Sequence, residues 1–369
     1  MPNVTNIPSP IIGVTSDDVV SNLKNQKKAL QLIGAKGMPT IRIVLELWQD
    51  PKLYLEAVKT LHGVEGRPRI AYVMCEVADS DYLWRFNDEH KDNEEHSDLL
   101  ARLHLFLDVL GDYVDAWEVG NEVNGEWAGW KGENGCEKGE RDYVEARMAA
   151  VRQAIGHQIV DVYKAVKTHP KSANADTVLT LYFYTNMNKQ CWPDRLMSRD
   201  CDEFHVRGED YEMLNWLGAN LYTHPDAVDF HPTHVLLSVY EDDCRDDDCN
   251  DLDLSPAMWV EIFEEIQGAF QDSLVGFGEV GTHCRDCKNK KLPRNGRECV
   301  ELQRANVRKH YSELHHNIGD MIKKDGRKIN YAGGYFYWFF TTDMVKKRRT
   351  DPDRKPALEE LLVALDGWV

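Results

Sequence analysis

Short runs of apolar and β-branched residues recur along the chain, and segments with helical spacing separate them. The helical spacing is clear at Leu99, Leu103, Phe106 and Leu110, which follow one another by four, three and four positions and share one helix face. The β-branched runs predict buried strands. We expect eight strands, in the ranges 11–14, 40–45, 69–74, 114–116 with the residues that follow it, 177–183, 234–240, 274–279 and 331–340.

This alternation predicts the fold class. Strands that alternate strictly with helices are parallel and joined by helical crossovers, and eight such units close most naturally into a barrel. An open doubly wound sheet would normally carry a glycine-rich turn after its first strand, and Gly13-Val14-Thr15 is not one. No linker rich in proline, glycine or serine divides the chain. We therefore expect an α/β fold, a (β/α)8 TIM barrel that forms a single domain over residues 1–369, with elaborated loops after strands four to seven.

Composition narrows the classes of partner. The net charge of -18 argues against nucleic acid, because phosphates would be repelled over most of the surface. A neutral ligand such as a sugar meets no such repulsion, although acidity also serves solubility alone. No apolar run reaches the roughly 18 residues that cross a membrane, so we expect no membrane partner. Met1-Pro2-Asn3-Val4-Thr5 lacks the pattern of a signal peptide, which favours the cytoplasm, or secretion if a leader was removed.

A carboxylic acid and an amide stand together where the fourth predicted strand ends. The segment Trp117–Gly125 contains Asn121 and Glu122, and a second glutamate, Glu279, ends the seventh predicted strand within the segment 276–281. Chemistry in such barrels sits at the C-terminal ends of the strands, so the two glutamates face one another across the barrel mouth. A carboxyl pair about 5–5.5 Å apart cleaves a glycosidic bond with retention, and a wider pair inverts.

These two segments resemble the motifs of the clan A glycoside hydrolases, a superfamily of retaining sugar-cleaving barrels. Its members carry Asn-Glu on strand four, and Gly-Glu-x-Gly on strand seven is common in cellulase-like members. The resemblance implies that Glu122 is the acid/base and Glu279 the nucleophile of a retaining glycosidase. The substrate implied is a β-linked oligosaccharide, polysaccharide or glycoconjugate, and catalysis needs no cofactor.

Four further residues match the pattern of the clan. Asn121 would hydrogen-bond the sugar 2-hydroxyl. Arg42 is a charge in an otherwise apolar strand, costly to bury unpaired, and in the family an arginine at this place keeps the nucleophile ionised. Tyr240 would donate a hydrogen bond to Glu279. Trp338 would form the apolar floor beneath the sugar ring, with ordinary core packing as its alternative.

The chain departs from the family pattern at two places. Many cellulase-like members carry a histidine where Ser238 stands, and the end of strand three, Cys75-Glu76-Val77, has no histidine. Three other functions therefore stay open. A transglycosylase would use the same two glutamates, and a carbohydrate-binding barrel would have lost turnover. A metal-dependent hydrolase would need His-x-His near the first strand, where none is found.

Five of the nine cysteines gather after the sixth and seventh predicted strands, at Cys244, Cys249, Cys284, Cys287 and Cys299. Loops that follow adjacent parallel strands are neighbours in space, so the two closely spaced pairs should meet at the rim of the barrel. We expect the first four to bind a structural zinc ion, with Cys299 as a possible substitute ligand.

Two other arrangements of this region are open. Disulfide bonds are the rival if the protein is secreted. The acidic residues between 246 and 253 could bind calcium, although they lack EF-hand spacing and a solvated acidic loop explains them as well. The zinc ion would order two long loops and take no part in bond cleavage.

Overall fold

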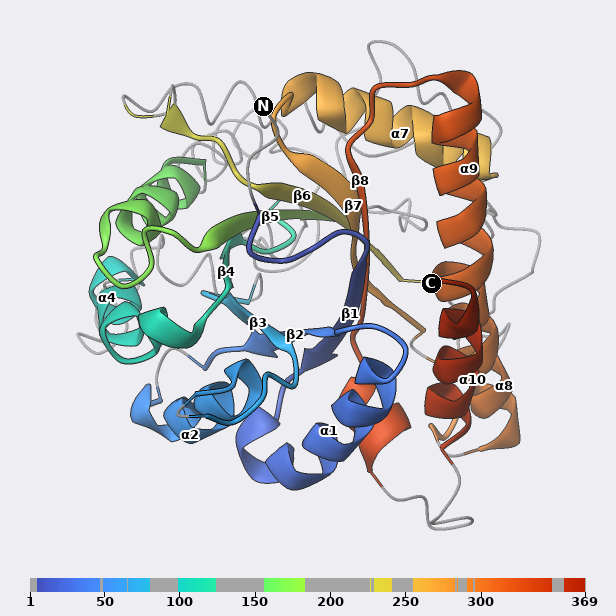
Figure 1. Cartoon of the computed structure of the whole chain (residues 1–369), viewed down its shortest axis with the longest axis horizontal. Coiled ribbons are helices and arrows are strands. Elements are labelled where there is room, and N and C mark those ends of the chain that lie inside the picture. The colour runs from blue at the N-terminus through green and yellow to red at the C-terminus, as the bar shows by residue number, and fades with distance from the viewer. Residues whose placement is uncertain are drawn as a thin grey trace, which may run out of the picture.

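The computed structural model describes residues 5–46, 49–64, 66–79, 99–123, 156–182, 226, 229–240, 255–282, 284, 291–294, 296–346 and 355–368. Eight parallel strands close into a barrel in chain order, with β8 paired to β1 (Figure 1). The strands are β1 (Ile11–Ser16), β2 (Thr40–Val44), β3 (Tyr72–Glu76), β4 (Ala116–Gly120), β5 (Asp176–Tyr182), β6 (His234–Tyr240), β7 (Leu274–Gly281) and β8 (Tyr331–Tyr337). The predicted (β/α)8 barrel fold is confirmed.

Helices lie around the outside of the barrel (Figure 1). They are α1 (Val19–Gly34), α2 (Lys52–His62), α4 (Leu99–Leu110), α7 (Pro256–Ala269), α8 (Arg297–Arg308), α9 (His315–Asp325) and α10 (Pro356–Ala364). Short 3-10 turns, η2 (Gly111–Tyr113) and η6 (Leu365–Gly367), and π-helical turns, η4 (Lys309–Leu314) and η5 (Phe340–Val345), complete the assignment. Residues 156–168 are also helical. None of the described helices is both long and apolar enough to span a bilayer.

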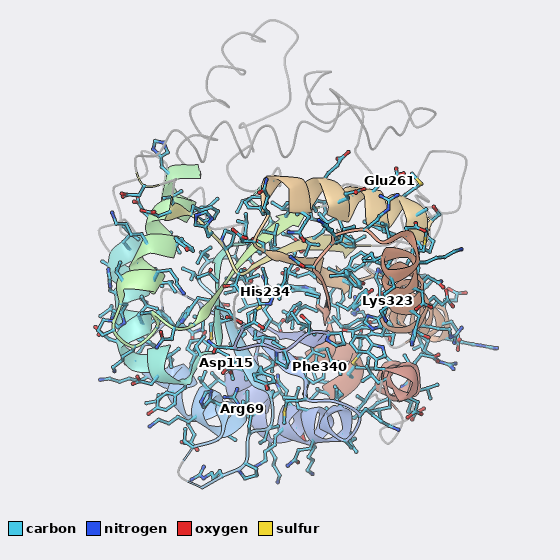
Figure 2. The ribbon with its side chains drawn as sticks, turned by 45° about the horizontal axis from the view of Figure 1, so that its top comes forward. Arg69, Asp115, His234, Glu261, Lys323 and Phe340 are labelled. Carbon is cyan, nitrogen blue, oxygen red and sulfur yellow. A yellow bond between two sulfur atoms is a disulfide. The ribbon has the colours of Figure 1, made fainter. Side chains whose placement is uncertain are left out.

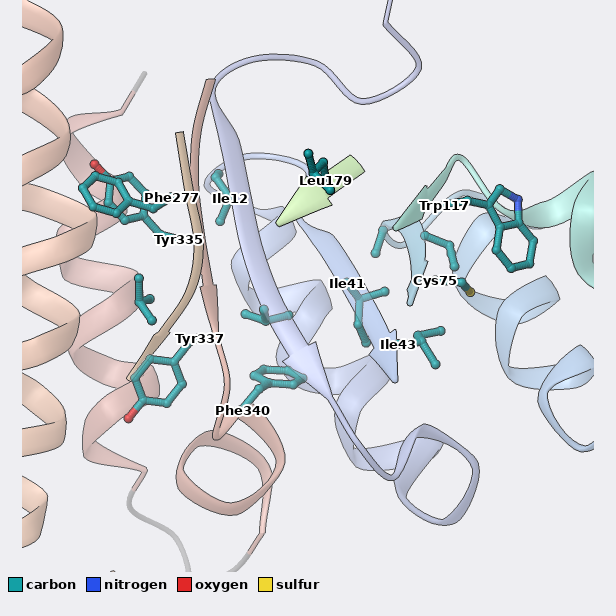
Figure 3. Packing of buried hydrophobic residues seen from close by; sticks show 14 of the residues in the cluster. Ile12, Ile41, Ile43, Cys75, Trp117, Leu179, Phe277, Tyr335, Tyr337 and Phe340 are labelled. Atoms are coloured by element: carbon teal, nitrogen blue, oxygen red, sulfur yellow. The ribbon is translucent and has the colours of Figure 1, made fainter. Parts of the chain in front are cut away.

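The main hydrophobic core lies between the strands and these helices. Outward residues such as Ile12, Ile41 and Trp117 belong to it, together with the apolar faces of the helices (Figure 3). Phe277 and Tyr335 stack within this core, with their ring centroids 4.8 Å apart. Successive strand residues point to opposite faces, so the strands direct every second residue into the barrel instead.

The inward positions divide the barrel interior into two halves. The half nearer the strand starts is apolar, and its buried cluster consists of Ile7, Ile11, Met74, Ala116, Val178, Leu236, Ala332 and Phe336. Two positions further along β3, β4, β5 and β6, the next inward residues are Glu76, Glu118, Thr180 and Ser238. The half nearer the strand ends is therefore lined with polar groups, on the side where barrels carry chemistry.

A bulge in β4 lies just before Glu122, and a bulge in β7 includes Glu279. β4 advances two residues, from Glu118 to Gly120, while its partner β5 advances one. β7 advances three residues, from Phe277 to Val280, while β6 advances two. An extra residue bends the strand and redirects the side chains beside it. Phe277 and Val280 thus both pack in the outer core, and the residue added between them lets Glu279 face the interior.

Strands three and eight differ most from their predicted ranges. The backbone N–H groups of Ile70 and Ala71 donate to the carbonyl of Leu61 at the end of α2. They are therefore unavailable to the sheet, and β3 begins later and includes Glu76 as its last residue. At the other end, Trp338 makes its backbone bond to β7 and the chain then turns into η5, so β8 stops before the predicted residue 340.

Candidate active site

One guanidinium holds three carboxyl groups inside the polar half of the barrel. Arg42 on β2 places Nε 2.5 Å from Glu118 on β4, Nη1 2.5 Å from Glu279 on β7 and Nη2 3.1 Å from Glu76 on β3. All four side chains are at most 3% exposed. Bonds to charged groups in a dry interior are stronger than bonds between neutral groups, so this cluster fixes the relative positions of four strands.

Arg42 keeps its charge in this environment. Burial by itself lowers the pKa of a guanidinium, but Glu118, Glu279 and Glu76 together raise the pKa of Arg42 well above its usual value. A buried cation without partners would be prohibitively costly. Four strands therefore cooperate to place a permanent positive charge beside Glu279.

Glu279 is the carboxylate that Arg42 reaches on β7. Its backbone N–H donates to Ser238 Oγ at 3.1 Å, which ties the bulge of β7 to β6. Gly278, directly before it, has no room for a side chain, since an added Cβ would lie 2.9 Å from Ser238 Oγ and from Thr180 Cγ2. A guanidinium at hydrogen-bonding distance favours the ionised carboxylate, which is the form that attacks as a nucleophile.

Glu122 stands just beyond the end of β4, in a different environment. Its backbone has a φ of +43°, in the left-handed region that non-glycine residues seldom adopt. Its side chain is 6% exposed. Burial raises the pKa of Glu122 well above its usual value, and the charge of Glu279 raises it further, while Arg42 and a hydrogen bond with Ser238 offset part of the shift. A carboxyl held protonated in this way can serve as a general acid.

The other residues singled out in the sequence lie around this pair. Asn121 is buried, and its Nδ2 donates to Glu76 Oε1 at 2.9 Å. Trp338 follows β8 and is partly exposed, with the Arg42 guanidinium carbon 5.7 Å from its ring centroid. Tyr240 ends β6, where its backbone pairs with Gly281. The Tyr240 side chain lies outside the described part of the structure.

Sequence reasoning missed two members of the cluster, Glu76 and Glu118. A signal for both is present in hindsight, because each lies two positions after an inward apolar residue and so shares the face of its strand that points into the barrel. The predicted range of strand three ended at residue 74 and left Glu76 outside the sheet. Glu118 lies in the same segment as Asn121 and Glu122, and its inward position on β4 distinguishes it from Glu122, which follows the end of that strand.

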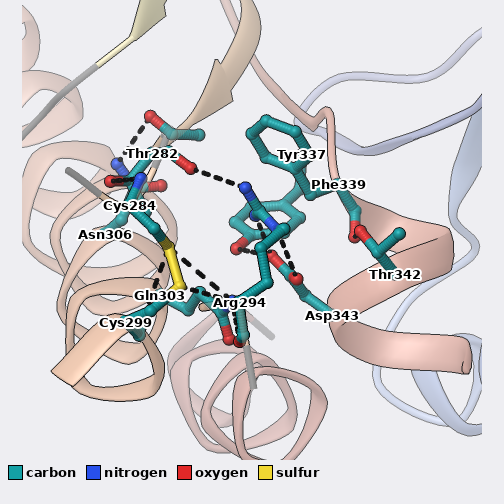
Figure 4. Close-up of polar contacts among 11 residues, drawn as sticks. Thr282, Cys284, Arg294, Cys299, Gln303, Asn306, Tyr337, Phe339, Thr342 and Asp343 are labelled. Carbon is teal, nitrogen blue, oxygen red and sulfur yellow. Dashed lines mark hydrogen bonds and ion pairs between the residues drawn. A yellow bond between two sulfur atoms is a disulfide. The ribbon is translucent and has the colours of Figure 1, made fainter. Parts of the chain in front are cut away.

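The prediction of Cys284 as a zinc ligand is wrong in this structure. Cys284 and Cys299 form a disulfide, with their Cα atoms 5.1 Å apart (Figure 4). A sulfur engaged in a disulfide offers no thiolate to a metal, and the rival assignment of a disulfide holds for this pair. Cys244, Cys249 and Cys287 lie outside the described residues. In the part of the chain that is described, no three His, Cys, Asp or Glu side chains gather to hold a metal ion.

The disulfide ties the segment that follows β7 to α8, and Arg294 ties the same segment to the end of β8. Arg294 in this segment pairs with Asp343 at 2.5 Å and donates to the Thr282 carbonyl at 3.2 Å (Figure 4). Its guanidinium also lies over the ring of Phe339, 3.5 Å from the centroid. Phe339 is the neighbour of Trp338, so these contacts hold the chain beside the predicted sugar floor.

No protein-family model matches the chain, and no curated protein matches it in sequence. Solved structures do match, over nearly the whole length of the chain. A family 5 glycoside hydrolase of Prevotella bryantii, in complex with a xyloglucan tetradecasaccharide, is 14% identical with a TM-score of 0.51, and the match covers 99% of each chain. The family 1 β-glucosidase of Thermotoga maritima is 11% identical with a TM-score of 0.52 and the same coverage.

A xylanase of Cellvibrio japonicus is similar to the same extent, at 12% identity and a TM-score of 0.51 over 98% of this chain and 99% of the xylanase. All three enzymes are clan A glycoside hydrolases, from three different families. At these identities the likeness concerns the fold. The chain thus has the barrel fold of the clan A glycoside hydrolases, as the resemblance of its motifs implied.

Proposed function

We propose that the protein is a retaining glycosidase that cleaves β-glycosidic bonds in an oligosaccharide, polysaccharide or glycoconjugate. The observation that carries this proposal is that two buried glutamates at the same end of the barrel lie in different electrostatic environments. Glu279 lies against the Arg42 guanidinium, and burial with a neighbouring negative charge raises the pKa of Glu122. Arg42 favours the ionised form of Glu279, and the raised pKa of Glu122 favours its protonated form, which are the two forms that double displacement requires.

The first half of the reaction forms a covalent intermediate. A Glu279 oxygen attacks the anomeric carbon as the bond to the leaving oxygen breaks, and the Glu122 proton passes to that oxygen. Arg42 then loses the full charge of its partner, because the attacking carboxylate becomes an ester. Its bonds to Glu76 and Glu118 keep the guanidinium in place at this stage.

The second half restores the enzyme. Glu122, now ionised, takes a proton from a water molecule, whose oxygen attacks the anomeric carbon and releases Glu279. Asn121 contacts the sugar 2-hydroxyl, Trp338 forms the floor beneath the ring and Tyr240 donates to Glu279 in this proposal. The likeness in fold to an enzyme solved with xyloglucan supports a carbohydrate substrate.

Two measurements test the function. Hydrolysis of a panel of aryl β-glycosides and of β-linked oligosaccharides should find a substrate. Proton NMR during the first minutes of hydrolysis should then show a product with the anomeric configuration of the substrate. Turnover with an inverted first product would contradict the retaining mechanism, and no turnover on any β-glycoside would contradict the proposed activity.

A further inference from the structure

Glu76 contacts both the arginine and the asparagine of the candidate site. It is the last residue of β3 and is fully buried. Its Oε2 lies 3.1 Å from Arg42 Nη2, and its Oε1 accepts a hydrogen bond of 2.9 Å from Asn121 Nδ2. One carboxyl group therefore connects the cation beside Glu279 to the amide beside Glu122.

This contact decides which way the Asn121 amide faces. Glu76 Oε1 is the acceptor of this bond, so the amide turns its NH2 group toward Glu76 and its carbonyl oxygen away. That oxygen, Oδ1, is buried and has no hydrogen-bond partner among the described residues. A buried carbonyl without a donor costs free energy. A hydroxyl group of a bound sugar is a donor that would satisfy it.

Glu76 and Glu279 also interact with the same positive charge, that of Arg42. Both carboxyl groups lie against the terminal nitrogens of the same guanidinium. Burial raises the pKa of Glu76 well above its usual value; Arg42 opposes the shift, and Asp79, Glu118 and Glu279 add to it. Replacing the Glu76 carboxyl by a neutral amide would remove a competing acidic group from Arg42, leave more of the Arg42 field to Glu279 and stabilise the ionised form of Glu279.

We propose that Glu76 is a positioning residue that makes Asn121 a hydrogen-bond acceptor for a substrate hydroxyl and shares Arg42 with Glu279. The inference rests on the proposed glycosidase function and adds a rule of specificity to it. The sugar must present a donating hydroxyl to Asn121. A deoxy, fluoro or methyl-ether analogue at that carbon cannot donate and is discriminated against.

The variant Glu76→Gln tests the orientation of the amide. Arg42 Nη2 can only donate, so the glutamine turns its oxygen to Arg42 and its NH2 to Asn121. The Asn121 amide must then flip and present its NH2 to the substrate. We expect kcat/KM to fall about 10- to 100-fold for the hydroxylated substrate, the cost of leaving a buried polar group without its partner, and little for the deoxy analogue.

A double-mutant cycle with Asn121→Ala separates positioning from general damage. Asn121→Ala should cost much less in the Glu76→Gln background than in the wild type, because the bond it removes is already lost. Glu118→Gln is the matched control, since Glu118 contacts Arg42 but has no contact with Asn121 among the described bonds. Its cycle with Asn121→Ala should be additive. Additivity for Glu76→Gln, or equal coupling for both variants, would overturn the proposal.

The pH profile gives a readout that a purely structural role does not move. Glu76→Gln and Glu118→Gln each remove a carboxylate from Arg42, so the acid limb of kcat/KM should shift to lower pH in both. If the acid limb of the kcat/KM profile is unchanged in Glu76→Gln, Glu76 and Glu279 do not share the charge of Arg42. If Glu76→Gln does not fold, Glu76→Asp keeps the charge but is one methylene shorter. It should leave the limb in place and lose most of the coupling to Asn121.

NMR tests the contact without any turnover. The side-chain amide of Asn121, labelled with nitrogen-15 and identified by its absence from Asn121→Ala, should shift in Glu76→Gln or Glu76→Asp and change little in Glu118→Gln. If the Asn121 amide resonance does not shift in the Glu76 variants, the proposal is overturned, whatever the activity of those variants. The expected shift in a protein that cleaves no glycoside would refute the proposed function and leave the positioning of Asn121 standing.

Discussion

The two halves of the barrel interior are formed by the same alternation of residues along the strands, but they differ in what they contribute to stability. The half near the strand starts is filled by apolar side chains such as Met74, Val178 and Leu236, whose burial stabilises the fold. The half near the strand ends buries Arg42 with carboxyl groups from three strands. Replacing such a group by apolar residues is often neutral or stabilising. The charged half is therefore best explained by chemistry and the apolar half by folding.

The largest expected effect comes from breaking the charged half at Glu279. Glu279→Gly should reduce turnover by at least about 10⁴-fold, as removal of a catalytic nucleophile does in other hydrolases. Steady-state kinetics on the best aryl glycoside measures it, with circular dichroism to show that the barrel persists. Near-normal turnover would show that the charged half is not where the chemistry occurs.

Glu122→Ala should act more selectively. Loss of the general acid slows substrates with poor leaving groups by about 10²- to 10⁴-fold and activated aryl glycosides far less. Added azide should restore turnover and yield the β-glycosyl azide, because the small anion occupies the place of the deleted carboxylate. Equal losses for good and poor leaving groups would contradict the role of Glu122.

Arg42→Met tests how the charged half of the interior contributes to the free energy of unfolding. It leaves buried carboxyl groups without their cation and should lower the free energy of unfolding by about 3–5 kcal/mol in denaturant titrations. Arg69→Met is the matched control, since Arg69 pairs with Asp115 at 2.6 Å but is 29% exposed. Its cost should be about 1 kcal/mol or less. Similar losses in the free energy of unfolding for both variants would mean that the buried charge cluster contributes no more to stability than a partly exposed ion pair.

The smallest effect concerns His234, a buried titratable side chain at the start of β6. It lies among the strands, far from the helical periphery marked by Glu261 and Lys323 (Figure 2). It is fully buried, and neither ring nitrogen has a partner among the described residues. Burial lowers the pKa of His234 to about 4.

The sign of the pH effect follows from that shift. The unfolded chain takes up a proton at His234 near pH 6.5 and the folded chain near pH 4, so stability is complete above pH 6.5 and declines as the pH falls toward 4. The loss should be at most about 3 kcal/mol. His234→Leu should remove this part of the acid dependence in denaturant titrations at pH 7 and pH 4.5. Parallel losses in variant and wild type would contradict it.

Local patterns were enough to predict the barrel, because strand and helix periodicity are properties of neighbouring residues. They also pointed to Glu122 and Glu279, since both stand at strand ends where parallel strands bring chemistry together. They failed at Glu76, where the backbone bonds of Ile70 and Ala71 to Leu61 delay the start of β3. They also failed at Cys284, because spacing alone cannot distinguish a metal ligand from half of a disulfide.

The sequence by itself determined the order of the strands, the apolar faces that pack beneath the helices and the residue types available at each strand end. The tertiary structure alone decided which of these residues meet. Arg42 and Glu279 are distant in the chain, and their contact depends on barrel closure and on the bulge in β7. The pKa of Glu122 is likewise a property of the assembled site, because it arises from burial and from charges on other strands. No local pattern records either quantity.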